Sequence, residues 1–85
     1  MSTPDDSIRH QIIKYVVGNH VSPYDAATIP LDQSLVELGV LDSYGVIELV
    51  SFLEATWSIT IADSEITRET MGSINKMVSL IRSKL

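Results

Sequence analysis

Residues 39–50 have the sequence GVLDSYGVIELV, and this stretch decides where the central helix of the protein begins. Asp42 and Ser43 are residue types that start helices, because their side-chain oxygens accept hydrogen bonds from free N–H groups of the first turn. Behind them, apolar residues recur at i, i+3, i+4, i+7 and i+11, which predicts a helix with one core-facing side. These residues are Val46, Leu49, Val50, Leu53 and Trp57.

A first helix is predicted ahead of this stretch, over about residues 4–17. Pro4 suits the first helical position, Thr3 can act as its cap, and Gly18-Asn19 supplies a C-terminal stop. Two acids follow the proline, in the positive first turn of the helix. The residues at core-facing spacing are Ile8, Ile12, Tyr15 and Val16.

A last helix is predicted at the other end of the chain, with Ser73 as its cap. Arg82 and Lys84 fall at its negative C-terminal end, where basic residues are favoured. Its apolar stripe consists of Ile74, Met77, Val78, Ile81 and Leu85. Between this helix and the central one, residues 57–61 alternate as in a short extended link, and residues 67–70 indicate a short turn of helix.

Residues 19–41 form a long connection with no steady period and two X-Pro pairs. So long an irregular segment fits a small domain only if it is packed down, and "LVEL" at 35–38 is suited to a single helical turn. The apolar residues available for packing are Val21, Ile29, Leu31, Leu35, Leu38 and Val40. The predicted fold is all-α: a small bundle of three main helices plus one short helix, with a long packed loop between helices one and two.

The chain has 85 residues, which predicts one domain spanning residues 1–85. Its formal net charge is −5, and residues 15–67 carry eight acids but no lysine or arginine. Such a field repels nucleic acid and anionic membrane surfaces and attracts basic protein patches. The acids are Asp25, Asp32, Glu37, Asp42, Glu48, Glu54, Asp63 and Glu65.

The sequence contains no cysteine, which excludes disulfides, thiolate metal sites and a thiol nucleophile of its own. The start, MSTPDD, has neither the basic nor the apolar part of a secretory signal, and no segment has the length of a membrane span. We therefore expect a cytoplasmic protein and take a monomer as the default. Met1 and the predicted last helix ending near Leu85 favour a free-standing chain.

Catalysis at Ser43 would need a base and an orienting acid, and neither His10 nor His20 is placed beside it by the sequence. The GxSxG elbow of serine hydrolases is absent, and no metal ligands cluster at a familiar spacing. We expect that this protein is not an enzyme.

The predicted central helix has a second face, which points away from the core. Its residues are Tyr44, Ile47, Glu48, Ser51 and Glu54. A partner with an apolar pocket rimmed by Lys or Arg would use both the apolar and the acidic members of this face. The alternative is that Tyr44 or Ile47 folds back under the long loop.

Ser43 likewise has two interpretations. It is either a helix cap or an exposed hydroxyl at the positive end of the helix, which would favour an esterified phosphate. Gly45 supports the second interpretation by leaving the first turn bare of a side chain.

The segment Gly39-Val40-Leu41-Asp42-Ser43-Tyr44 resembles the serine motif of acyl carrier proteins, with one extra residue between glycine and aspartate. The likeness extends over LDQSLVELGVLDS, IELVSFLEATWSITI and SEITRETMGSINKMVSLI, and so covers nearly the whole chain. Tyr44 stands where leucine or methionine is usual, and Gly45 where fatty-acid-synthesis members often have an acid. The motif is closer to that of specialised-pathway and aminoacyl-type carriers.

The resemblance implies that a phosphopantetheinyl transferase, with Mg²⁺, attaches 4′-phosphopantetheine from coenzyme A to Ser43, with Asp42 positioning the transfer. The thiol of the arm would carry acyl or aminoacyl groups as thioesters. Tyr44, Ile47, Glu48, Ser51 and Glu54 would dock the loading and downstream biosynthetic enzymes through basic patches. The competing hypothesis is an unmodified acidic helical adaptor that docks a basic partner through the central helix, the second of the three main helices.

Overall fold

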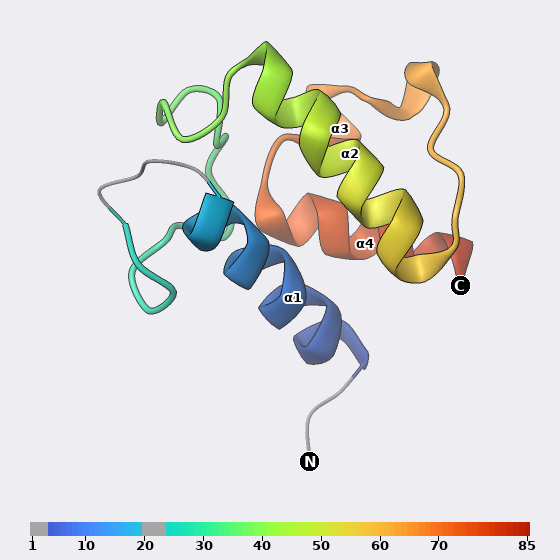
Figure 1. The fold of residues 1–85 in the computed structure, drawn as a ribbon, viewed down its shortest axis with the longest axis horizontal. Coiled ribbons are helices and arrows are strands. Elements are labelled where there is room, and N and C mark those ends of the chain that lie inside the picture. The colour runs from blue at the N-terminus through green and yellow to red at the C-terminus, as the bar shows by residue number, and fades with distance from the viewer. Residues whose placement is uncertain (1–3, 20–23) are drawn as a thin grey trace.

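The structure is a computed structural model that describes residues 4–19 and 24–85, and over these ranges it contains helices and loops but no strand (Figure 1). The predicted all-α fold with three main helices is confirmed. Its elements are α1 (Pro4–Asn19), α2 (Ser43–Trp57), the 3₁₀ turn η1 (Asp63–Glu65), α3 (Arg68–Met71) and α4 (Ile74–Lys84). α3 is a single turn of four residues, so the expected short fourth helix of a bundle is not confirmed.

α1 is longer than the sequence indicates, because Gly18 does not stop it. The helix continues to Asn19, and Gly39, not Gly18, is the glycine with positive φ in the described part of the chain. Asn19 extends the last turn by donating its side-chain amide to the Tyr15 carbonyl, at 2.9 Å. Thr3, the expected cap, lies outside the described residues.

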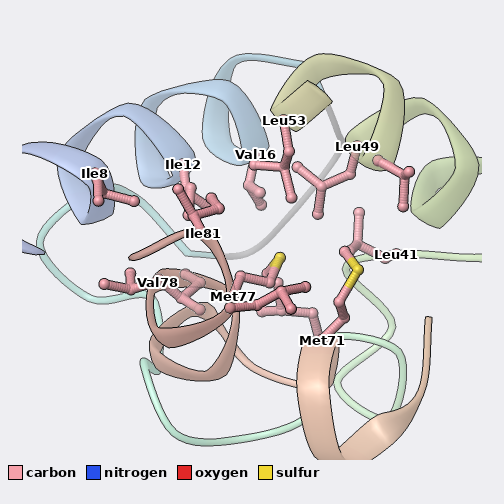
Figure 2. Packing of buried hydrophobic residues seen from close by; sticks show 14 of the residues in the cluster. Ile8, Ile12, Val16, Leu41, Leu49, Leu53, Met71, Met77, Val78 and Ile81 are labelled. Atoms are coloured by element: carbon pink, nitrogen blue, oxygen red, sulfur yellow. The ribbon is translucent and has the colours of Figure 1, made fainter. Parts of the chain in front are cut away.

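The three long helices bury most of their predicted stripes in one shared core (Figure 2), and Tyr15, Val46 and Trp57 are partly buried against it. α1 packs on α4 at close range, whereas α1 meets α2 through side chains, with the Tyr15 and Phe52 rings stacked at 4.2 Å. Leu85 is a correction: it follows the last residue of α4 and is 65% exposed, so it is not part of the core. The buried helical residues include Ile8, Ile12, Val16, Leu49, Leu53, Met77, Val78 and Ile81.

The long connection before α2 is packed down, as expected. Ile29, Leu35, Val40 and Leu41 are buried, while Val21 lies outside the described residues. Backbone hydrogen bonds join the loop to the far end of the chain, from Leu35 N–H to the Gly72 carbonyl and from Asn75 N–H to the Leu31 carbonyl. The segment 35–38 forms a single turn in which Leu38 N–H donates to the Ser34 carbonyl at 3.0 Å, the bond of one helical turn that is not continued into a helix.

The link after α2 begins at Ser58, whose left-handed backbone ends the helix and whose N–H bonds the Glu54 carbonyl. Ile61 buries its side chain, and its N–H donates to Glu54 Oε2 at 2.9 Å, which fastens the link to the end of α2. None of the helices in the described ranges has the length and apolarity of a membrane span.

Candidate functional site

The cap of α2 is Asp42, the residue before the helix. Its backbone is extended, and its Oδ1 accepts a hydrogen bond from Gly45 N–H at 2.7 Å. Its carbonyl accepts the Val46 N–H at 3.0 Å, the first backbone bond of the helix. The Asp42 side chain therefore caps the helix, a role that the sequence allowed for either Asp42 or Ser43.

Ser43 is the first residue of α2, and its side chain is exposed to solvent. Within residues 4–19 and 24–85, its hydroxyl forms no hydrogen bond. It therefore stands at the electropositive end of a 15-residue helix without a competing partner. Such a hydroxyl is open to an incoming phosphate and to the active site of another protein.

Gly45 does not play the part expected of it. It is buried, with its N–H on the Asp42 carboxylate, so it lies on the inward side of the first turn. A position on the inward side does not open the approach to Ser43.

The outward face of α2 is open to solvent along its first half. Tyr44 is 78% and Ile47 is 63% exposed, so neither folds back under the long loop. Glu48 and Ser51 are exposed as well. Glu54 differs from these four residues, because it is half-buried and its carboxylate accepts the Ile61 N–H.

Glu48 supplies negative charge in the middle of this face. Burial of the Tyr15 phenol, together with the nearby Glu48 carboxylate, raises the pKa of Tyr15 above its ordinary value. In the described part of the chain, no ion pair involves Glu48. Three bases elsewhere form ion pairs with acids other than Glu48: Arg9 with Asp6, Arg82 with Asp5 and Lys84 with Glu65.

Beside the first turns of α2 lies a hollow of about 410 Å³ that the sequence did not indicate. α2 contributes Val46, the loop before it contributes Val36, and the segment around α3 contributes Ile66 and Met71. The full lining is Ser34, Val36, Glu37, Val46, Ile66, Thr67, Met71 and Gly72. Val36, at the rim, is 54% exposed and was not among the predicted site residues.

A comparison with family models finds no match to this chain. Among curated proteins, the chain is 43% identical over 49 residues to the D-alanyl carrier protein of Streptococcus suis strain 05ZYH33, which covers 58% of this chain and 62% of that protein. It is 40% identical over 48 residues to the D-alanyl carrier protein of Streptococcus pyogenes serotype M1, covering 56% and 61%. The match thus spans less than two thirds of the length of these relatives. Their names confirm the expected resemblance to carrier proteins.

Proposed function

We propose that this chain is a discrete carrier protein that bears a 4′-phosphopantetheine arm on Ser43 and is not itself an enzyme. The proposal rests on the different roles of Asp42 and Ser43 at the start of α2. Asp42 satisfies the first turn, and the Ser43 hydroxyl is left exposed and without a hydrogen bond in the described chain. No base of the described residues is hydrogen-bonded to this hydroxyl, which suits an acceptor better than a catalytic nucleophile.

The residues present fit a phosphate ester at this position. The N-terminal N–H groups and the dipole of α2 favour negative charge at Ser43. Ser43 Oγ would form a bond to the phosphopantetheine phosphorus of coenzyme A as the pyrophosphate P–O bond breaks, with adenosine 3′,5′-bisphosphate leaving and the hydroxyl proton passing to a base of the transferase. Asp42 would position this transfer by lying next to the acceptor, where a Mg²⁺ ion brought by the transferase offsets the repulsion between carboxylate and phosphate.

When attached, the arm supplies a terminal thiol that holds cargo as a thioester. The names of the relatives support an aminoacyl cargo, and we take D-alanine as the first candidate. The chain itself has no cysteine that would compete for the cargo. Its own task is to present Ser43 to successive enzymes.

Those enzymes would dock on the outward face of α2, which consists of Tyr44, Ile47, Glu48 and Ser51. The exposed apolar pair and the Glu48 carboxylate, which forms no ion pair with any described residue, support a partner surface that is apolar at its centre and basic at its rim. Glu54 would contribute by holding the end of α2, since its carboxylate is engaged with Ile61. Docking of this kind is weak and sensitive to salt, which lets the carrier leave each partner.

We further propose that residues 1–85 act as one carrier domain, as a monomer and in the cytoplasm, where coenzyme A and the transferase have access to Ser43.

The test is the intact mass of the purified chain after incubation with coenzyme A, Mg²⁺ and a broad-specificity phosphopantetheinyl transferase. The wild-type chain should gain one phosphopantetheine, and Ser43→Ala should gain none. An unmodified adaptor would leave the wild-type mass unchanged, which would overturn the proposal.

The cargo is tested on the modified chain, with ATP and an enzyme that activates D-alanine. D-alanine should be loaded in preference to L-alanine and acetate, whereas equal loading of acetate would contradict an aminoacyl carrier.

A further inference from the structure

We propose that Val36 forms a second docking element, separate in sequence from α2, for the enzymes that act on Ser43. The inference rests on the proposed carrier function and extends its docking surface across the neighbouring loop. Val36 is a large apolar side chain that is 54% exposed, and it lies on the rim of the hollow beside α2.

The backbone around Val36 is held in place by its neighbours. Leu35 is buried, its N–H donates to the Gly72 carbonyl at 3.1 Å, and its carbonyl accepts the N–H groups of both Val40 and Leu41. Gly39 closes the turn with a φ of +76°, a conformation that other residues rarely adopt. With Leu35 fixed inward, Val36 is directed outward as a rigid apolar projection. A rigid projection loses little conformational entropy when a partner covers it.

This projection belongs to the same end of the molecule as Ser43. Val36 shares the hollow with Val46, which lies one turn after Ser43 on α2, so the loop and the helix start are neighbours (Figure 1). The exposed large apolar residues of the described chain are Val36, Tyr44, Ile47 and Leu85. Three of the four thus belong to this loop or to the first half of α2, while Leu85 is at the C-terminus.

The charge around this surface selects the kind of partner. Glu37 follows Val36, and Asp42 and Glu48 belong to the adjoining helix start, within a stretch that has no lysine or arginine from residue 15 to residue 67. A second copy of this chain, or an anionic lipid surface, would bring like charge to the same place. The occupant that fits is an enzyme whose apolar contact patch is bordered by Lys or Arg.

The proposal is tested with the unmodified chain as the substrate of the phosphopantetheinyl transferase. Val36→Ser should raise the KM for the chain about fivefold, which corresponds to losing part of a valine side chain from an interface. The kcat should stay unchanged, because Val36 contacts the partner and not the reacting atoms. The matched control is Leu85→Ser, which removes an apolar side chain that is 65% exposed at the C-terminus and should leave both constants unchanged.

Val36→Ile keeps the apolar projection and should retain the wild-type KM. Thermal unfolding of each variant shows whether the fold is intact, and Val36→Ala replaces Val36→Ser if the serine variant does not fold. A KM for Val36→Ser or Val36→Ala equal to that of the wild type would overturn the docking role and leave the carrier function standing. A wild-type chain that is never modified would instead overturn the carrier function, and the docking role with it.

Discussion

α2 and α4 begin with the same kind of cap, but the first residue of α2 is exposed and the first residue of α4 is buried. In each helix, the cap residue has an extended backbone, and its side-chain oxygen accepts a hydrogen bond from the N–H three residues later. Gly45 N–H donates to Asp42 at 2.7 Å in α2, and Lys76 N–H donates to Ser73 at 3.2 Å in α4. The difference lies in the next residue. After Asp42 comes the exposed Ser43, whereas after Ser73 comes the fully buried Ile74.

The comparison shows that register, and not residue type, decides what a serine at a helix start can do. Ser73 is 2% exposed and its hydroxyl is used by the helix. Ser43 is one position further into its helix, where an aspartate has already taken the cap. Only the second arrangement leaves a hydroxyl for chemistry.

Exchanging the two residues at the start of α2 should break this comparison with the largest effect. In the double variant Asp42→Ser with Ser43→Asp, the serine stands at the cap position and its hydroxyl is used as that of Ser73 is. Serine and aspartate both cap well, so the fold should be retained while phosphopantetheine attachment is lost completely. Intact mass and circular dichroism measure the two outcomes. Modification of the exchanged chain at the wild-type rate would show that the register does not matter.

Reversing the charge on the α2 face should have the next largest effect. Glu48→Lys should raise the KM of the transferase for the chain about tenfold without lowering the melting temperature, because Glu48 is exposed and its charge would face the proposed partner. Glu54→Lys is the matched control and should lower the melting temperature, since the Glu54 carboxylate accepts the Ile61 N–H. If Glu48→Lys destabilised the fold and left transfer intact, the assignment of the faces would be wrong.

Replacing the serine at the start of α4 should affect stability and not modification, whereas replacing Ser43 in α2 should affect modification and not stability. Ser73→Ala should destabilise the protein by about 1 kcal/mol, the usual cost of losing a cap, and leave the modification of Ser43 unchanged. Ser43→Ala should change the free energy of unfolding by less than about 0.5 kcal/mol, as expected of an exposed side chain that forms no hydrogen bond with the described residues. Urea titrations of both variants measure these values. Equal destabilisation by the two would contradict the division of roles.

The smallest effect concerns the link between α2 and α4. Two hydrogen bonds to Glu65 Oε1 hold the pKa of Glu65 below its ordinary value of 4.5. The larger effect comes from Lys84 Nζ at 2.9 Å and the smaller from the Ala62 N–H at 3.0 Å. A lowered carboxyl pKa gives stability that is present above the ordinary value and is lost as the pH falls through the folded one. Lys84→Met should therefore lower the melting temperature slightly at pH 7, and the difference from wild type should shrink on acidification below pH 4.5. A difference that grows at low pH would contradict this sign.

The sequence predicted the parts of the molecule that depend on local spacing. The stripes of α1, α2 and α4 and the start of α2 follow from the helical period and from the preference of Asp and Ser for helix ends. The prediction that Gly18-Asn19 ends the first helix was wrong, because a glycine ends a helix only where the chain turns. Asn19 instead continues α1, and its side-chain amide donates to the Tyr15 carbonyl.

The parts that the sequence did not predict depend on contacts between distant segments. Val36 is exposed because Leu35 is fixed inward by Gly72, 37 residues away, as part of the loop's attachment to the chain around α3. Glu54 has the spacing of the outward face, but the link after α2 returns and engages its carboxylate. Neither contact leaves a periodic signal in one sequence.

The most direct measurement of the central claim is the fragmentation mass spectrum of the wild-type chain after treatment with coenzyme A and the transferase. Our account predicts one added phosphopantetheine, located on Ser43, with Ser73 and every other serine unmodified. An added group on any residue other than Ser43, or a Ser43 that stays unmodified under these conditions, would contradict it.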